Sequence, residues 1–210
     1  MRSREIQKYL ADMTARPIGE IDQRIRPLRK TMEISTGPRG IRAPHMDLVQ
    51  TGMHILSLAS QRVTDAFDVA KSLMDLRLVP HPEFPDLTRP FLQDNGNSSF
   101  IAMLAMAMSD GLASARFEFK YIELSETGSF AVVHLDRGSL KNLRFIYWPA
   151  KHLKIVPEDK TSGIYNLLDH TSFDRRLVIS CQHLRSLGER VIAECEGGIG
   201  DQADALSAEA

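Results

Sequence analysis

An apolar stripe with helical spacing runs through residues 18–32 and constrains the fold more than any other feature of this sequence. Its apolar residues recur at steps of three and four, and at about 100° per residue they fall within an arc of about 80°. Pro17 suits the start of such a helix because the N–H that proline lacks is not needed there. The pattern predicts a helix with one buried side, which the interior Pro27 is expected to kink or end. The residues of the stripe are Ile18, Ile21, Ile25, Leu28 and Met32.

The opposite face of this predicted helix is polar and basic. Gln23, Arg26 and Lys30 lie on it, and Glu20 and Arg24 flank it. A helix with this division can bury one side in its own domain while long polar side chains reach a partner. The alternative is a core helix with an ordinary solvated face.

The segment that follows cannot be helical, because two glycines and two prolines fall within residues 34–45. A short strand, a tight basic turn at Gly37 to Gly40 and a return strand fit it best. Arg39 and Arg42 then project from a loop. The alternative is a plain surface turn.

Charge is divided unevenly along the chain, although the net charge of its 210 residues is only −1. Residues 1–46 hold ten Lys and Arg against five acids, which leaves 16 basic and 22 acidic residues for the remainder. A basic region joined to an acidic one is typical of a nucleic-acid-binding module with a partner domain. Chance clustering of surface charge is the alternative.

Two helices with a short break and then a basic, Gly-rich loop resemble the winged helix-turn-helix DNA-binding proteins of bacteria and phages. The resemblance covers roughly the first 60 residues. Residues 17–30, Pro-Ile-Gly-Glu-Ile-Asp-Gln-Arg-Ile-Arg-Pro-Leu-Arg-Lys, match the recognition helix, and Gly37-Pro38-Arg39-Gly40-Ile41-Arg42 matches the wing. The resemblance implies that this part of the chain binds double-stranded DNA.

Side-chain chemistry assigns a role to each candidate DNA-binding residue. Gln23 can contact adenine and Arg26 can contact guanine with paired hydrogen bonds, each giving about 1–3 kcal/mol of discrimination. Three further cations of the helix, Arg24, Arg29 and Lys30, are expected to contact phosphates. The loop residues Arg39 and Arg42 are expected to enter the minor groove or to lie along the backbone.

The remaining elements are predicted from apolar periodicity and turn residues. Helices are expected over 4–13, 47–59, 64–78, 98–113 and 181–194. Strands are expected over 115–124, 129–135, 142–148 and 176–180, with a hairpin turn at Thr127-Gly128-Ser129. Four prolines make residues 80–97 look like an extended connector between two domains. The tail over 196–210 holds four acids and no basic residue, and is expected to be disordered.

Motifs of enzymes and metal sites are not recognisable. His81-Pro82-Glu83 matches half of a zinc-deaminase signature, but the P-C-x-x-C half is missing. The seven histidines show neither H-x-x-x-H nor H-E-x-x-H spacing, and no nucleotide-binding glycine motif precedes a helix. Cys181 and Cys195 are more simply packing residues than catalytic ones. We therefore expect no enzymatic activity, no metal and no cofactor.

Two other groups of residues have a binding alternative. The Met-rich stretch at Met103, Met106 and Met108 is expected to be core, with an adaptable pocket as the alternative. Aromatic residues beside cations over 137–154 could stack on single-stranded nucleic acid, with a solvated sheet face as the default. That second group comprises Arg137, Lys141, Arg144, Phe145, Tyr147, Trp148, Lys151 and Lys154.

These observations predict an α+β protein of two domains. Residues 1–79 form the winged helix-turn-helix region with following helices, 80–97 the connector, and 98–195 a domain of helices on a small antiparallel sheet. The expected function is a sequence-specific double-stranded DNA-binding transcriptional regulator that acts as a homodimer, because one short helix reads few base pairs. The alternative is a phage or bacterial assembly or adaptor protein that docks protein or holds DNA without sequence choice; an enzyme is a further rival.

The surroundings of the protein follow from what its sequence lacks. The longest apolar run, Phe100 to Met108, is well short of the roughly 20 residues that a membrane span needs. No uninterrupted apolar stretch follows the N-terminus, so no signal peptide is expected. With only two cysteines, a disulfide framework is not expected either. We expect a cytoplasmic protein without a membrane partner, whose C-terminal domain serves dimerisation, effector sensing or another protein.

Overall fold

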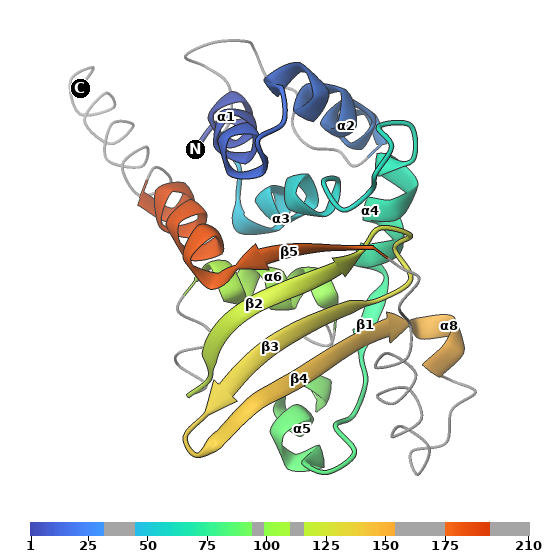
Figure 1. Cartoon of the computed structure of the whole chain (residues 1–210), viewed down its shortest axis with the longest axis vertical. Coiled ribbons are helices and arrows are strands. Elements are labelled where there is room, and N and C mark those ends of the chain that lie inside the picture. Colours follow the sequence, from blue (N-terminus) through green and yellow to red (C-terminus); the bar gives the residue numbers. More distant parts are fainter. Residues whose placement is uncertain (32–44, 94–98, 110–115, 154–174, 194–210) are drawn as a thin grey trace, which may run out of the picture.

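The protein combines helices with one antiparallel sheet, as a computed structural model shows (Figure 1). The structure describes residues 1–31, 45–93, 99–109, 116–153 and 175–193. The predicted α+β class is confirmed. The predicted wing over 34–45, apart from His45, and the predicted tail over 196–210 lie outside the described residues.

The first two predicted helices are confirmed as α1 (Ser3–Thr14) and α2 (Ile18–Thr31). They contact each other, and Ala15, with φ 53°, ends α1 in the left-handed conformation that often closes a helix. Pro27 lies inside α2 but does not end it. Ile18 does not join the buried stripe, since it is 44% exposed, whereas Ile21, Ile25 and Leu28 are fully buried.

The third helix, α3 (Leu48–Leu56), lies within the predicted 47–59 and begins at a capping box formed by Asp47 and Gln50. The prediction of a single helix over 64–78 is wrong at its end. A helix forms over α4 (Ala66–Met74), and β1 (Leu76–Leu78) follows it as a strand. Leu76 and Leu78 are buried with Arg77 less so between them, which is the period of two that a strand requires.

The proline-rich stretch is not fully extended, which corrects the prediction for 80–97. It contains α5 (Pro85–Gln93), whose first residue is a proline, as the first turn of a helix allows. Strand β1 pairs with β4 (Leu140–Pro149), and this pair joins the chain before the stretch to the chain after it. The domain division at 80–97 stays a prediction.

The second half of the described chain begins with α6 (Phe100–Met108), which Ser99 caps through its hydroxyl. Strands β2 (Glu118–Ser125), β3 (Ala131–Arg137) and β4 (Leu140–Pro149) form an antiparallel meander. Gly128, with φ 75°, lies in the predicted hairpin turn between β2 and β3. A short helix α8 (Ala150–Leu153) follows β4, and β5 (Arg176–Ser180) leads into a helix over residues 181–193. The predicted strands are confirmed to within a few residues.

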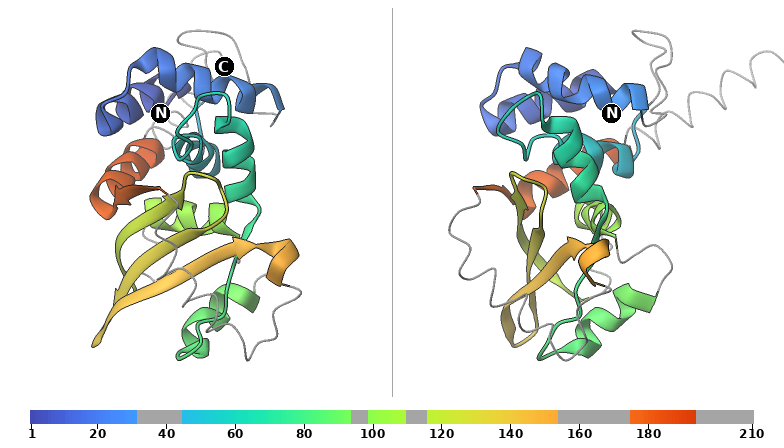
Figure 2. Two further views of the ribbon diagram at one scale, coloured as in Figure 1. Left: turned by 45° about the vertical axis from the view of Figure 1, so that its right-hand side comes forward. Right: turned by 90° about the vertical axis from the view of Figure 1, so that its right-hand side faces the viewer.

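The sheet has the order β1-β4-β3-β2-β5. Helices α5 and α6 lie on the same side of it, and α1 and α2 lie at the far end of the molecule from α5 (Figures 1 and 2). One hydrophobic core runs from Leu10 and Ile25 through Leu73 to Phe100 and Phe145, so the N-terminal helices and the sheet share it. No helix among the described residues is long and apolar enough to cross a membrane.

The Met-rich helix α6 belongs to this core, as its default interpretation predicts. Met103 and Met108 are buried in it. Gly188, in the helix over 181–193, packs so closely on α6 that an added Cβ would overlap the carbonyl group of Met108. The two helices therefore pack at backbone contact, with no room for a larger side chain at Gly188.

Candidate nucleic-acid interface

Helix α2 keeps its buried and exposed sides sharply apart. Three apolar side chains, Ile21, Ile25 and Leu28, are fully buried. On the other side Gln23, Arg26 and Lys30 are exposed, and they share a face about 60° wide at the helical repeat of about 100° per residue. The structure thus places three of the predicted DNA-binding residues together on one accessible face.

Asp22 lies at the edge of this face and contacts two of the predicted arginines. Its Oδ2 accepts a hydrogen bond from Arg26 Nη2 at 2.8 Å, and its Oδ1 accepts one from Arg29 Nη1 at 3.3 Å. Gln7 of α1 also donates to Oδ1, at 3.2 Å. The hydrogen bond from Arg26 is the largest cause that lowers the pKa of Asp22. Asp22 is therefore ionised at neutral pH and offsets part of the positive charge of α2.

Arg29 turns toward α1 instead of standing free on the helix surface. Its Nη2 donates to the Ser3 hydroxyl at 2.7 Å, and its side chain is 27% exposed. The Ser3 hydroxyl in turn lies 3.4 Å from His54 Nε2, while His54 Nδ1 donates to the carbonyl oxygen of Gln50 at 2.8 Å. Since Nδ1 faces a carbonyl, the neutral ring carries its proton there and Nε2 accepts from Ser3.

His54 is completely buried under this edge of α2. Burial is the main cause that lowers the pKa of His54 to about 4. The hydrogen bond to Gln50 acts in the opposite direction, and the nearby charge of Arg29 lowers the pKa further. A neutral ring at physiological pH completes the chain of hydrogen bonds from Arg29 to α3. No motif or spacing in the sequence singles out this histidine.

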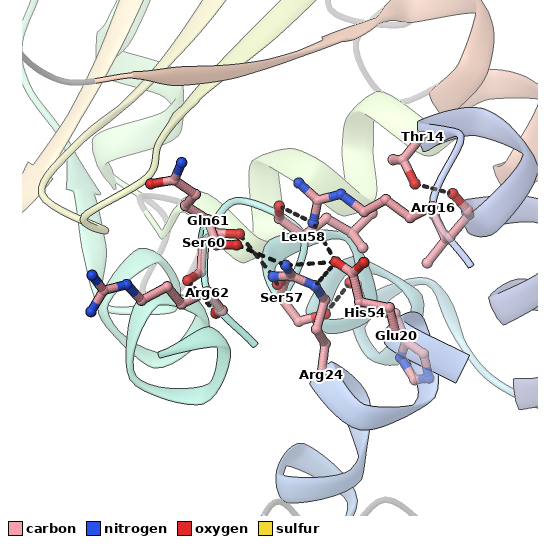
Figure 3. Close-up of polar contacts among 11 residues, drawn as sticks. Thr14, Arg16, Glu20, Arg24, His54, Ser57, Leu58, Ser60, Gln61 and Arg62 are labelled. Atoms are coloured by element: carbon pink, nitrogen blue, oxygen red, sulfur yellow. Dashed lines mark hydrogen bonds and ion pairs between the residues drawn. The ribbon is translucent and has the colours of Figure 1, made fainter. Parts of the chain in front are cut away.

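Arg24 points inward, unlike the other predicted cations of α2. It is 1% exposed, and its guanidinium donates to the carbonyl oxygens of Ser57, Ser60 and Gln61 in the turn between α3 and α4 (Figure 3). Two more of its hydrogen bonds reach Glu20 one turn earlier, at 3.0 and 2.8 Å. The predicted phosphate contact of Arg24 does not fit this placement, because every edge of the guanidinium is used inside the protein.

Arg16 strengthens the same attachment from the start of α2. Its Nη1 donates to the carbonyl oxygen of Leu58 at 3.3 Å and lies 3.7 Å from Glu20 Oε1 (Figure 3). Glu20 thus lies between two arginines, Arg16 and Arg24. These contacts fix the orientation of α2 relative to α3 and α4, and so they determine which face of α2 points outward.

The two predicted loop cations, Arg39 and Arg42, lie outside the described residues. The structure places both ends of the segment that carries them. Helix α2 ends at Thr31, and His45 forms an antiparallel bridge with Arg2, supported by a 2.9 Å hydrogen bond from Met46 N to Met1 O. The chain therefore returns to the N-terminus beside α1 after this segment.

A second polar cluster lies on the sheet, on the face opposite the core. Glu123 Oε2 accepts a 2.6 Å hydrogen bond from Arg176 Nη1, and Oε1 lies 3.2 Å from His134 Nε2 in a close contact that is not a well-directed hydrogen bond. The Tyr121 ring stacks on His134 at 4.0 Å. The His134 contact and then the Arg176 bond hold the pKa of Glu123 at about 2. Glu123, His134 and Arg176 line a hollow together with Arg144 and the apolar Val132 and Ile146.

The aromatic residues near that hollow do not form a stacking platform for single-stranded nucleic acid. Phe145 and Tyr147 are fully buried in the core, and only Trp148 of the three is partly exposed. Successive residues of a strand point to opposite faces, so Phe145 and Tyr147 share the inner face while Arg144 and Trp148 share the outer one. Among the cations of this group, Lys141 and Lys151 are exposed, as the default interpretation of a solvated face predicts, whereas Arg137 and Arg144 are half-buried. Lys154 lies outside the described residues.

Metal and thiol chemistry gain no support from the described part of the chain. It contains no group of three or more His, Cys, Asp or Glu that could hold a metal ion. Burial raises the pKa of the Cys181 thiol, which disfavours the thiolate that a nucleophile needs. Cys195 lies outside the described residues.

Comparison with known protein families, with curated proteins and with solved structures finds no match for this chain.

Proposed function

We propose that this chain is a sequence-specific double-stranded DNA-binding protein of transcriptional control, and that residues 16–42 form its interface in a winged helix-turn-helix arrangement. The observation that carries the proposal is the exposed face of α2, where Gln23, Arg26 and Lys30 stand together while the apolar side is buried. The excess of basic residues over 1–46 supports it, because phosphates attract such a region. The antiparallel bridge of His45 with Arg2 supports it as well, because it brings the chain after residues 32–44 back beside α1.

In this proposal α2 enters the major groove, which admits a single helix and displays a distinct pattern for each base pair. Gln23 and Arg26 reach base edges. Lys30 and Arg29 contact phosphates at the side of the groove. Arg24 is not included, since it holds α2 to the turn after α3.

Salt dependence of binding tests the electrostatic part of the proposal. The full chain is titrated with a random duplex at several salt concentrations, and the log–log slope should steepen by roughly 0.9 for each phosphate neutralised. Lys30→Ala and Arg39→Ala should each lower the magnitude of the slope by roughly 0.9, the amount that corresponds to one phosphate contact. The matched control is Lys141→Ala, an exposed lysine of the β3–β4 hairpin on the sheet. A flat salt response of the wild type contradicts DNA binding.

Selection from random duplexes tests sequence choice. The wild type should enrich a short motif, and Arg26→Ala and Gln23→Ala should each relax one or two positions of it, by about 1–3 kcal/mol per base contact. Arg39→Ala should weaken binding to all sequences about equally. If the wild type binds DNA but enriches no motif, the assembly or adaptor protein replaces the regulator as the best account.

We also propose that the protein acts as a homodimer, because two recognition helices read two half-sites and multiply specificity. From the sequence, either the helix predicted over 64–78 or the C-terminal domain is expected to hold the dimer. The apolar side of α4, at Val69, Ala70 and Leu73, is buried within the chain, so this helix has little apolar surface left to offer. Val178, 57% exposed on the edge strand β5, belongs to the C-terminal domain. Light scattering of the wild type and of Val178→Asp tests this; a monomeric wild type at tens of micromolar contradicts it.

A further inference from the structure

Asp22 is an acid at the edge of a surface proposed to bind a polyanion, and its position there needs an explanation. An unpaired carboxylate beside phosphates weakens binding by charge repulsion. Asp22 is 32% exposed, and both of its oxygens accept hydrogen bonds from side chains. Two of the donors, Arg26 and Arg29, are residues that the proposed function places on DNA.

The geometry leaves Arg26 able to contact a base while Asp22 holds it. A guanidinium has five N–H donors in a fixed plane. Of the three nitrogens of the Arg26 guanidinium, only Nη2 donates to Asp22. The remaining donors of Arg26 point away from this bond, and its side chain is 64% exposed. A guanidinium held at one edge keeps fewer rotamers, so it loses less conformational entropy when it pairs with guanine.

The other oxygen of Asp22 has a different set of partners. Oδ1 accepts from Arg29 of the same helix and from Gln7 of α1. Asp22 is therefore held in place by α1, and its hydrogen bond in turn fixes the position of the Arg26 guanidinium. A carboxylate on a freely rotating side chain could not do this.

We propose that Asp22 is a positioning residue for specificity: it fixes the Arg26 guanidinium for guanine and, by its charge, lowers affinity for duplexes that offer no base contact. This inference rests on the proposed function of α2. It assigns to Asp22 an effect on sequence choice that is opposite in sign to its effect on non-specific binding. A purely structural role, such as linking α1 to α2, would weaken binding to all duplexes alike.

The experiment compares Asp22→Ala with the wild type in two measurements on the full chain. In selection from random duplexes, Asp22→Ala should lose about tenfold discrimination at the position that Arg26 reads, within the range of one base contact. In titration of a random duplex at low salt, the same variant should bind as tightly as the wild type or a few-fold more tightly, because a negative charge has been removed. In the Arg26→Ala background, Asp22→Ala should leave the motif unchanged, since the residue that it positions is gone.

Two further variants keep the result interpretable. Asp12→Ala removes an exposed acid of α1 and should raise non-specific binding slightly without altering the motif. Asp22→Asn keeps an oxygen that can accept from Arg26 and should fall between the wild type and Asp22→Ala in discrimination. If Asp22→Ala does not fold, as far-ultraviolet circular dichroism would show, the comparison of Asp22→Asn with the wild type decides.

The outcomes separate the inference from the function on which it rests. A wild type without a motif removes the proposed function and the inference with it. A wild-type motif that Asp22→Ala and Asp22→Asn reproduce with full discrimination overturns the positioning role and leaves DNA binding standing. Equal loss of affinity for motif and random duplexes overturns it too, in favour of a structural role.

Discussion

Arginine and acid meet in two regions of this protein, and the two regions use them differently. Beneath α2, the Arg24 guanidinium is 1% exposed and donates mainly to backbone carbonyl oxygens of the turn after α3. On the outer face of the sheet, Arg176 is 28% exposed, donates to the side chain of Glu123 and lies over the Phe130 ring. A side-chain partner can move away with little cost, but a backbone partner cannot move without moving the chain.

This difference separates structural cations from available ones. Buried carbonyl groups that lose a donor remain unsatisfied, which costs about 1–3 kcal/mol each. A pair on a solvated face loses far less, because water replaces the partner. Charge along the sequence therefore says little about which arginine can meet a ligand; depth and the nature of the partner decide.

The largest expected effect tests the helical region. Arg24→Met should lower the free energy of unfolding by about 3–5 kcal/mol, because the methionine fills the space but leaves the carbonyl groups of the turn without donors. Arg24→Lys, which keeps the charge but has fewer donors in a different geometry, should lose less than Arg24→Met. Denaturant unfolding measures both. A loss below about 0.5 kcal/mol for Arg24→Met, as at an ordinary surface site, would remove the distinction drawn between the regions.

His54 gives the next effect, which depends on pH. Its folded pKa of about 4 lies below the ordinary value of 6.5, so the unfolded chain takes up the proton more readily. The contribution of the neutral ring is complete above pH 6.5 and is lost as the pH falls toward 4, by up to about 3 kcal/mol. The free energy of unfolding is measured for the wild type and for His54→Gln from pH 7 to pH 4. The difference between the two proteins should change by about 3 kcal/mol over this range. Parallel curves would contradict the burial of a neutral ring.

Glu123 on the sheet should give a smaller effect with a different window. Its pKa of about 2 lies below the ordinary 4.5, so its contribution is complete above pH 4.5 and is lost as the pH falls toward 2. Solvent screening limits that contribution to about 1–2 kcal/mol. Glu123→Gln should cost this much at pH 7 and progressively less below pH 4.5. A cost as large as that of Arg24→Met would place the sheet cluster among the structural charges.

Arg26 should give the smallest effect on stability. The pair of Arg26 with Asp22 is largely exposed, and such pairs contribute about 0–1 kcal/mol. The free energy of unfolding of Arg26→Met should therefore lie within about 1 kcal/mol of the wild-type value, in direct contrast to Arg24→Met two residues away. A large loss of stability would mean that the exposed face of α2 is needed for folding, which would weaken its assignment to a partner.

Much of the fold could be predicted because apolar spacing determines which side of an element is buried. The stripe of α2 and the strands of the meander are examples, and their positions match the structure closely. The prediction over 76–78 failed because Leu76 and Leu78 fit both a helix that ends and a strand that starts, and only the pairing with β4 decides between them.

The candidate interface was predictable only in part. Gln23, Arg26 and Lys30 lie opposite the apolar stripe, and the helical repeat alone identifies them. Arg24 lies about 40° from Leu28 on the same repeat, beside the stripe, so its position already favoured burial over exposure. What no local pattern could supply is the turn at 57–61 that receives its guanidinium, since that turn is more than thirty residues further along the chain.

The second cluster had no signal in the sequence. Glu123, His134 and Arg176 come from three strands, and only the register of the sheet brings them together. Arg176 is 53 residues from Glu123 in sequence. Contacts of this kind can be predicted only when the order and register of the strands are known.

Lysine acetylation of the full chain, with and without a 20-base-pair duplex, tests the central claim most directly, because the two regions carry exposed lysines that report separately. Lys30 lies on the exposed face of α2, Lys141 on the sheet hairpin and Lys71 on α4. The ratio of modification with and without duplex at each lysine cancels differences in intrinsic reactivity. The account predicts a several-fold lower ratio at Lys30 and ratios near unity at Lys71 and Lys141. Protection of Lys141 with none at Lys30 would contradict it and place DNA on the sheet.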